Sequence, residues 1–384
     1  MTAPFLALVA DDLTGAADAV APFASAWHVE LRLAAGAAAT RRDEPTVYAE
    51  TTDSRARSLE DAAALTHAAV TDLRVQGADR LFIKVDSTMR GSVPGQIRGA
   101  LDAWGAGAFA VLCPAYPQHG RTVSNNIVAV NGVPVAETGT ATDPVTPVTT
   151  SKLAELVPGS VHLPAPTSAA TLAAALLAAA ADGATIIAVD ASTQQHLTAI
   201  AAAVQLIGDR AVAIGSSGLA TALSRTWLEE IPVPAVQPDP NSGEVLVVVS
   251  SLHTVSRAQL ATLLASGFPA AHMVSTPTNK TESPEVVARS LAGAVQQRLA
   301  SGQFTAVVLV GGDGALAVLR QLGATAIHIH RELFDGVPLG AVIGGTADGL
   351  TVVTKSGGFG GPDALAEIVS SLQPQNHTQK RTTA

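Results

Sequence analysis

Short apolar segments alternate with longer Ala- and Leu-rich segments over most of the chain, and this alternation restricts the possible fold more than any other feature. Six apolar segments in the first half are each followed by a loop and usually by apolar residues at helical spacing. They are FLALVA (5–10), TVYAE (46–50), RLFIKVD (80–86), AFAVLCP (108–114), TIIAVD (185–190) and RAVAIGS (210–216). Apolar strands that alternate with helices are typical of a mainly parallel sheet covered by helices. The predicted fold class is therefore α/β.

The alternation is interrupted once, and the interruption predicts a domain boundary. Residues 231–243 read IPVPAVQPDPNSG, and because proline fixes φ and lacks an N–H group, we expect a stiff exposed connector there. A second series of strands and helices follows, from VLVVVS to GLTVVTK. We predict two domains, each a mainly parallel sheet flanked by helices, with the active site in the cleft between them. The expected bounds are 1–230 for the first domain, 244–372 for the second and 373–384 for a disordered tail.

Composition excludes several classes of protein. The chain has 384 residues, 47% of them hydrophobic, which is enough for two cores. A net charge of −9 argues against a surface that binds nucleic acid. The one cysteine, Cys113, rules out a disulfide framework, and neither a secretory signal nor a membrane-length apolar run is visible. We expect a cytoplasmic protein with no nucleic-acid or membrane partner, and a homodimer is the default assembly.

Paired aspartates follow the first apolar segment, in VADDLTGAADA. Asp11, Asp12 and Thr14 lie where a strand turns into a helix. One aspartate suffices to cap a helix by accepting its first N–H groups. The second is left over, and ligands of open α/β sheets collect beyond the carboxyl ends of strands. We therefore favour a ligand site over a helix cap alone, although the sequence does not say which aspartate does which.

Two further strand ends of the first half carry charged and hydroxyl side chains. Arg55 follows one strand, and its guanidinium suits a carboxylate, although a solvated surface pair explains it equally well. The segment KVDSTMRG adds Lys84, Asp86, Ser87 and Arg90. A capped helix with a neutralising Lys–Asp pair would explain part of this segment but not its arginine. The combination favours an anionic, polyhydroxylated ligand.

The second half repeats glycine and hydroxyl residues at three strand ends. The candidates that could contact a nucleotide are Ser250, Ser251, Ser256, Gly311, Gly312, Asp313, Gly314, Gly357 and Gly358. Glycine lets the backbone approach a ligand closely, and a helix start with hydroxyl groups suits phosphate. Asp313 has two interpretations, as a ligand of Mg²⁺ or as a helix cap. Three such turns in one domain favour a nucleotide site.

Several familiar motifs are absent. No G-x-x-x-x-G-K-[ST] occurs, so the chain has no Walker-type phosphate loop. The absence of G-x-G-x-x-G counts against a standard dinucleotide site, and no H-E-x-x-H or G-x-S-x-G indicates a zinc hydrolase or an α/β-hydrolase. A sugar-acid site in one domain and a nucleotide site in the other together favour phosphoryl transfer.

The motifs ADDLTGAADA, DSR, KVDSTMRG, CPAYPQHGRT, GSSGLA, GGDGA and VVTKSGGFG, in this order, resemble those of the four-carbon acid sugar kinases. The resemblance runs from about residue 6 to residue 372. It implies a transferase that uses ATP, with Mg²⁺, to phosphorylate tetronic acids such as threonate, erythronate and oxo-tetronates. The first domain would then bind the acid and the second the nucleotide.

The resemblance also implies site residues. Substrate contacts fall on Asp11 or Asp12, on Arg55 and on 84–87, and nucleotide contacts fall on the serines of SSLHTVS and on the glycines of GGDG and KSGGFG. Gly314 departs from the family, which commonly has a hydroxyl residue there. We expect phosphorylation of the terminal (4-) hydroxyl, with Asp12, Asp86 and Asp313 as unranked candidates for the proton acceptor. The metal ligands stay unassigned.

Three alternatives remain open on the sequence. A kinase for a 3-oxo- or 2-oxo-tetronate would use the same residues. An aldolase, lyase or dehydrogenase for sugar acids would use Lys84 as a Schiff-base lysine, although no dinucleotide motif supports a dehydrogenase. A binding protein that closes on a sugar acid would need neither ATP nor the glycine-rich turns.

Overall fold

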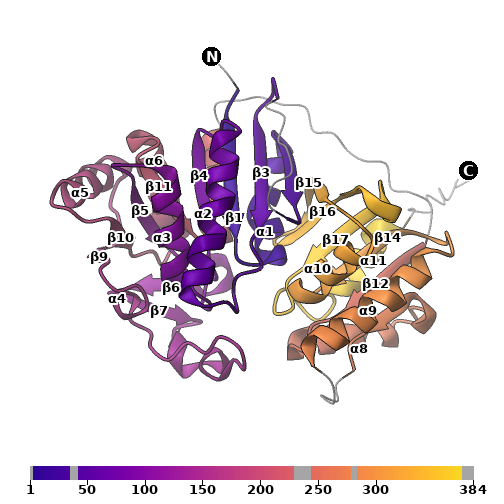
Figure 1. The fold of residues 1–384 in the computed structure, drawn as a ribbon. Coiled ribbons are helices and arrows are strands. Elements are labelled where there is room, and N and C mark those ends of the chain that lie inside the picture. Colours follow the sequence, from indigo (N-terminus) through magenta and orange to yellow (C-terminus); the bar gives the residue numbers. More distant parts are fainter. Residues whose placement is uncertain (1–2, 35–41, 229–243, 278–282, 374–384) are drawn as a thin grey trace, which may run out of the picture. The chain divides into compact units, whose positions relative to one another are not determined.

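The computed structural model describes residues 3–34, 42–228, 244–277 and 283–373. The chain divides into two compact units (Figure 1). Unit 1 comprises Met1–Val236 and Thr325–Glu332, and unit 2 comprises Gln237–Ala324 and Leu333–Ala384. The proline-rich connector expected over 231–243 lies outside the described residues, as does all of the expected tail beyond its first residue.

Unit 1 contains a sheet whose strands pair in the order β15, β2, β3, β1, β4, β11, β5, β10, β9. Their bounds are β15 Ala326–Phe334, β2 His28–Arg32, β3 Thr46–Thr51, β1 Phe5–Ala10, β4 Arg80–Lys84, β11 Ala211–Gly215, β5 Phe109–Cys113, β10 Ile186–Val189 and β9 Val161–Leu163. All of these pairings are parallel except that of β15 with β2. Every residue of β1 is buried, as expected for a strand covered on both faces.

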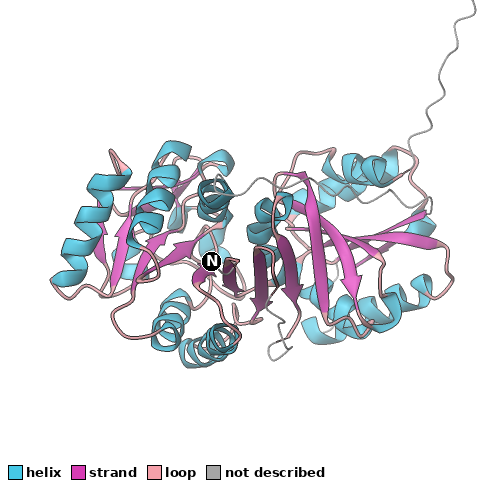
Figure 2. Ribbon diagram, turned by 90° about the horizontal axis from the view of Figure 1, so that it is seen from above, coloured by secondary structure: helices cyan, strands magenta, loops and turns pink. Residues whose placement is uncertain are grey.

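Helices lie on both faces of this sheet (Figure 2). Helix α2 packs against α3, while α1, α7, α6 and α5 pack in a row. The helices are α1 Leu13–Val20, α2 Leu59–Val75, α3 Val93–Trp104, α4 Leu153–Leu156, α5 Ala169–Ala181, α6 Gln194–Ile207 and α7 Ser217–Leu228, with 3₁₀ turns at Ala21–Ser25, Pro117–His119, Val135–Glu137 and Gly139–Thr142. A small antiparallel sheet is formed by β6 Arg121–Ser124, β7 Ile127–Val130 and β8 Val133–Pro134.

One strand of unit 1 comes from the C-terminal half of the chain. Residues 326–329 of β15 pair antiparallel with β2, so that His328 lies opposite Glu30 and Ile327 opposite Leu31. The rings of His28 and His328 lie 4.6 Å apart. The sequence alternation contains no sign of this pairing, because strand order between distant segments is not encoded in local periodicity.

Unit 2 has a sheet in the order β13, β12, β14, β17, β16, of which only β16 is antiparallel to its neighbour β17. The strands are β12 Glu244–Val249, β13 Met273–Ser275, β14 Phe304–Val310, β16 Val337–Ile343 and β17 Thr351–Lys355. The helices are α8 Thr254–Ala265, α9 Pro284–Leu299, α10 Gly312–Gln321 and α11 Ala364–Leu372, with 3₁₀ turns at Ala270–His272 and Gly345–Ala347. Helices α8 and α11 contribute Leu263 and Ile368 to a core with the valines of β12 and β14.

The strand register brings the loops that follow the strands to one edge in each unit. In unit 1, Ala10 at the end of β1 lies opposite Thr51 of β3 and Lys84 of β4. In unit 2, Val310 lies opposite both Val249 and Lys355. The α/β fold with a mainly parallel sheet flanked by helices is confirmed. Among the described residues, no helix has the length and apolar character needed to span a bilayer.

Candidate functional site

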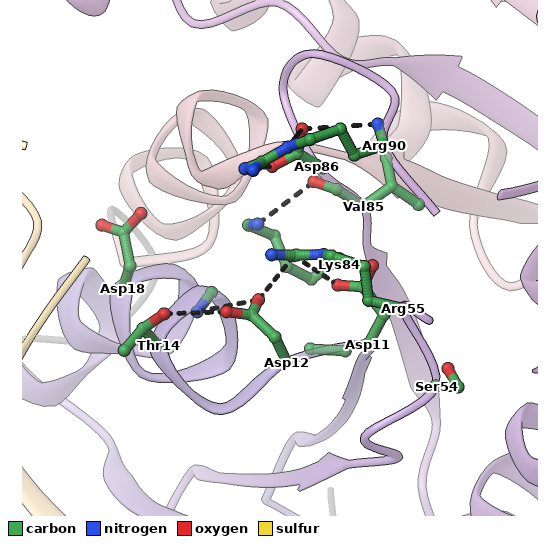
Figure 3. Close-up of polar contacts among 12 residues, drawn as sticks. Asp11, Asp12, Thr14, Asp18, Ser54, Arg55, Lys84, Val85, Asp86 and Arg90 are labelled. Carbon is green, nitrogen blue, oxygen red and sulfur yellow. Dashed lines mark hydrogen bonds and ion pairs between the residues drawn. The ribbon is translucent and has the colours of Figure 1, made fainter. Parts of the chain in front are cut away.

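Six charged side chains gather where β1, β3 and β4 end, and we call them the strand-end cluster (Figure 3). They are Asp11, Asp12, Arg55, Lys84, Asp86 and Arg90. All six were predicted as site residues, and parallel pairing explains why segments 80 residues apart meet here. With three carboxylates and three cations, the cluster is balanced in formal charge.

Asp11 and Arg55 form a bidentate pair. Arg55 Nε donates to Asp11 Oδ2 at 2.9 Å, and Nη2 donates to Oδ1 at 2.7 Å. Arg55 Nη2 also lies 2.7 Å from Asp12 Oδ1. Asp11 is 1% exposed, so a ligand meets the arginine before it meets this carboxylate. The Nη1 atom of Arg55 donates no hydrogen bond to any residue that the structure describes, which leaves one edge of the guanidinium for a ligand.

Asp12 is the aspartate that caps α1. Its backbone is extended (φ −144°, ψ 156°) and its Oδ1 accepts from Gly15 N at 3.1 Å. Thr14 Oγ1 donates to Asp12 Oδ2 at 2.7 Å. A Cβ at position 15 would lie 2.3 Å from Asp12 Oδ1 and 3.0 Å from Lys84 Nζ. The glycine of DDLTG is therefore required because a carboxylate and an ammonium group both approach its backbone.

Lys84 is a buried lysine at the end of β4. Its Nζ donates to Val85 O at 3.1 Å, and this is the one hydrogen bond that it makes to the described residues. An ammonium group has three donors. Lys84 is 5% exposed, and the remaining donors are suited to an acceptor that a ligand brings.

Asp86 holds the KVDSTMRG segment together. Arg90 donates to it three times, from Nη2 at 2.9 Å, from Nε at 3.1 Å and from its backbone N–H at 3.4 Å, and Thr88 donates through its N–H at 3.1 Å and through its hydroxyl. Arg90 Nη1 also reaches Asp143 Oδ2 at 3.3 Å. Ser87, the remaining predicted residue of this segment, is half-buried.

The electrostatics keep two carboxylates of the cluster ionised. Burial opposes ionisation of Asp86, but Arg90 and Arg55 outweigh it and hold the pKa of Asp86 well below 3.8. Burial likewise opposes ionisation of Asp12, and there Arg55 and Lys84 lower the pKa below the ordinary value. Both groups are therefore hydrogen-bond acceptors at neutral pH and weak bases.

A pocket of about 310 Å³ lies beside the cluster. Arg55 and Gly91 contribute to its wall, as does the loop Val145–Thr149. Gly91 has φ +90°, and a Cβ there would lie 3.2 Å from Asp11 Oδ2, so the backbone must pass close to the cluster. Asp143 was missed as a site residue, because its contact with Arg90 depends on where a distant loop returns rather than on a local motif.

The predicted residues of unit 2 also converge. Ser250 Oγ donates to Val310 O at 2.9 Å, and Ser251 Oγ accepts from His253 N at 3.2 Å. A Cβ at Gly311 or at Gly314 would lie within 2.5 Å of an atom of Ser250. The side chain of Ser250 therefore fills the space that a residue larger than Gly314 would need.

The other site residues predicted in unit 2 lie at the start of α10, in the loop after β17 and on α8. Gly312 and Asp313 open α10, with Asp313 exposed in its first turn. A Cβ at Gly357 would lie 2.1 Å from Ser251 Oγ, so the loop after β17 touches the loop after β12. Gly358 is exposed. Ser256 is fully buried and donates to Gly357 O at 2.6 Å.

Comparison with known proteins shows two family models that match successive segments of the chain. Residues 6–223 match the family model for a sugar-binding N-terminal domain, and residues 270–365 match the model for a nucleotide-binding C-terminal domain. The chain is 37% identical to a D-threonate kinase of Bordetella bronchiseptica over 99% of this chain and 100% of that protein. It is 26% identical to a 3-oxo-tetronate kinase of Brucella melitensis over 92% and 93%.

A solved structure extends the comparison. A Bordetella bronchiseptica protein of 37% identity, described as a domain-swapped dimer with bound citrate, matches with a TM-score of 0.55 over 96% of this chain and 98% of that one. Both family models, the similarity along the full length and the motifs at the strand ends point the same way. The chain belongs to the four-carbon acid sugar kinase family.

Proposed function

We propose that the chain is an ATP-dependent kinase that transfers the γ-phosphoryl group of ATP to the terminal (4-) hydroxyl of a four-carbon sugar acid such as D-threonate or D-erythronate. The observation that carries the proposal is the strand-end cluster, which lies within the segment that matches a sugar-binding domain. Its mixture of ionised acceptors and cationic donors is complementary to a molecule with one carboxylate and several hydroxyls.

On the acid side, we assign the substrate carboxylate to Lys84 and to the Nη1 edge of Arg55. Asp11 takes up the other edge of that guanidinium and so fixes its orientation. Asp12 and Asp86 are ionised and accept hydrogen bonds from substrate hydroxyls. Ser87 and Arg90 stand beside them as further contacts.

On the nucleotide side, the glycine-rich turns of unit 2 fit a triphosphate. Serine side chains leave no room for a Cβ at 311, 314 and 357, so these three positions of the turns are restricted to glycine. Asp313, exposed in the first turn of α10, is the candidate carboxylate for Mg²⁺. The described residues contain no group of three or more His, Cys, Asp or Glu side chains arranged so that it could hold a metal ion.

The reaction requires little covalent help from the protein. The substrate hydroxyl oxygen bonds to the γ-phosphorus, the bond to the β,γ-bridging oxygen breaks, and the hydroxyl proton passes to a carboxylate. The transition state is loose in most phosphoryl transfers, so a weakly basic carboxylate that orients the hydroxyl is sufficient. We place Asp12 in that role because it is ionised and its side chain is 14% exposed, whereas Asp11 is enclosed. When bound, Mg²⁺ neutralises charge on the phosphates.

Binding measurements test this assignment. In Lys84→Met, we expect D-threonate to bind at least about tenfold more weakly by calorimetry, because a charged hydrogen bond is lost, with ADP binding unchanged. Lys152→Met, a lysine in an exposed ion pair, is the matched control. Equal binding of the acid to Lys84→Met and to the wild type would contradict the role of this lysine.

A 3-oxo-tetronate is a second candidate acceptor, because the Brucella melitensis relative carries that name. Its keto group lacks one hydroxyl donor, and Asp12 and Asp86 would then compete for the remaining hydroxyls. Comparing kcat/KM for D-threonate and for its oxo analogue decides between them.

We also propose that the chain forms a homodimer. The support is the Bordetella bronchiseptica structure, which is described as a domain-swapped dimer. Light scattering of the purified protein tests this assembly, and a mass of one chain at micromolar concentration would contradict it.

A further inference from the structure

The loop Ser356–Gly361 that follows β17, here called the glycine loop, has five carbonyl groups held by side chains. Lys355 Nζ donates to Ser356 O at 3.0 Å, and Ser256 Oγ donates to Gly357 O at 2.6 Å. Gln259 Nε2 lies within hydrogen-bond distance of three more carbonyl oxygens, those of Phe359 at 3.0 Å, Gly360 at 3.1 Å and Gly361 at 2.8 Å. A single amide group thus serves three consecutive residues of the loop.

The three donors are all withdrawn from solvent. Ser256 and Lys355 are fully buried, and Gln259 is 1% exposed. Ser256 and Gln259 are three residues apart on α8, so both face the loop from the same side of that helix. Buried polar side chains are costly unless their hydrogen bonds are made, and here the loop carbonyls supply the acceptors.

The N–H groups of the same loop are not used in this way. Those of Gly357, Gly358 and Gly360 donate no hydrogen bond to any part of the chain that the structure describes. Gly358 and Gly360 are exposed. With its carbonyls held toward α8 and these N–H groups available, the loop presents the partial positive charge that binds anions in backbone nests. The Lys355 ammonium beneath it adds a full charge.

We infer that Gln259 is a positioning residue for the nucleotide: it holds the glycine loop so that the loop N–H groups meet phosphate oxygens. The inference rests on the proposed nucleotide site in unit 2. Ser256 acts with Gln259 through Gly357 O and does not itself contact the nucleotide. Gln259 was not among the site residues predicted from the motifs, although its spacing of about one helical turn from Ser256 was visible in the sequence.

The test is Gln259→Met, which keeps an unbranched side chain of similar length but removes the donor. We expect the Kd for ADP, measured by calorimetry, to rise about tenfold, since about 1.4 kcal/mol corresponds to that factor. The KM for ATP should rise in parallel, while kcat at saturating ATP and the KM for the sugar acid change less than about twofold. Gln297→Met, on the exposed part of α9, is the matched control.

The outcomes separate this inference from the proposed function. If the wild type binds no ADP, the nucleotide site itself is wrong. If the wild type binds ADP and Gln259→Met binds it equally well, the positioning role alone is refuted. A fall in kcat together with a rise of similar size in the KM for ATP and in the KM for the sugar acid would indicate general damage to the fold. That result would also refute the positioning role of Gln259. Should Gln259→Met fail to fold, Ser256→Ala removes a neighbouring anchor, and unchanged ADP binding by that variant would overturn the inference.

Discussion

The side chain of Ser250 decides what position 314 can hold. A Cβ at Gly314 would lie 2.1 Å from Ser250 Cβ and 2.3 Å from its Oγ. We predict that Gly314→Ala destabilises unit 2 by about 1–3 kcal/mol, because overpacking forces one of the two loops to move. Adding Ser250→Gly should recover most of that loss in thermal unfolding experiments. If Gly314→Ala alone were as stable as the wild type, Ser250 would not restrict position 314.

Lys355 lies buried beneath the glycine loop, and burial lowers its pKa to about 8. In the unfolded chain the pKa is near 10.5. Between these values the unfolded state binds more protons than the native state, so this group makes stability rise as pH increases from about 8 to 10.5. We predict that Lys355→Met is more stable than the wild type at pH 7 and lacks this rise, while it binds ADP more weakly.

Melting temperatures of both proteins between pH 7 and 10.5 check this prediction. Lys152→Met, at an exposed position, is the control and should leave the pH dependence unchanged. If Lys355→Met were less stable than the wild type at pH 7, the cost assigned to the buried ammonium would be wrong.

Asp12 combines a helix cap with the chemical role that we propose, and two substitutions separate these roles. Asparagine caps helices about as well as aspartate, so Asp12→Asn should keep the helix cap and lose only the charge interaction with Arg55 and Lys84. We expect its kcat to fall at least about tenfold, as for the loss of a group that handles a proton. Asp12→Ala should lose activity to the same extent and should be about 1 kcal/mol less stable than Asp12→Asn, because it also lacks the cap. Full activity in Asp12→Asn would rule out the proposed role.

The residues of the strand-end cluster could be predicted individually, but their pairing could not. A strand followed by polar residues is a local pattern, and it indicated Asp11, Arg55 and Asp86 correctly as neighbours of one sheet edge. Which aspartate caps α1 and which forms the bidentate pair with Arg55 depends on backbone angles and on the directions of two adjacent side chains. The sequence carries no local signal for either.

At the scale of elements, Asp190 fastens the β6–β7 hairpin to the end of β10. Its carboxylate accepts from Asn125 N at 2.7 Å and from Asn126 N at 3.1 Å, and it also contacts His162 Nε2 at 2.8 Å. Both asparagines have positive φ, 50° and 66°, as a tight hairpin turn of this kind requires. The turn depends on one buried carboxylate from a distant strand.

We predict that Asp190→Ala loosens this hairpin without unfolding either unit. Hydrogen exchange should become faster over residues 121–130, because two backbone donors lose their acceptor. Exchange in α2 and in unit 2 should stay as in the wild type. Unchanged protection of the hairpin would show that Asp190 is not its anchor.

The elements also show where periodicity stops being informative. The apolar runs predicted most strands of both sheets, since buried parallel strands have a distinctive composition. They did not indicate that β15 pairs with β2, because the composition of a strand does not show which distant strand it pairs with. Its contacts, such as His28 against His328, join segments that lie 300 residues apart.

At the scale of the whole molecule, two family models match successive segments of the chain. The sugar-binding match ends at residue 223 and the nucleotide-binding match starts at residue 270. The sequence led to the same assignment because carboxylates and cations follow the strands of one half and glycines follow those of the other, and the bounds of the two domains stay a prediction. It did not predict which tetronate is used, since that choice depends on hydroxyl contacts far finer than a motif.

The most direct test of the account is to incubate the protein with Mg²⁺–ATP and each of D- and L-threonate, D- and L-erythronate and their oxo forms, and to follow the products by ³¹P NMR. We expect ADP to appear only when an acceptor acid is present, together with a new phosphomonoester on the C4 hydroxyl of at least one acid. Conversion of an acid without ATP, or the absence of a phosphorylated product from every acid, would contradict the assignment of the chain as a tetronate kinase.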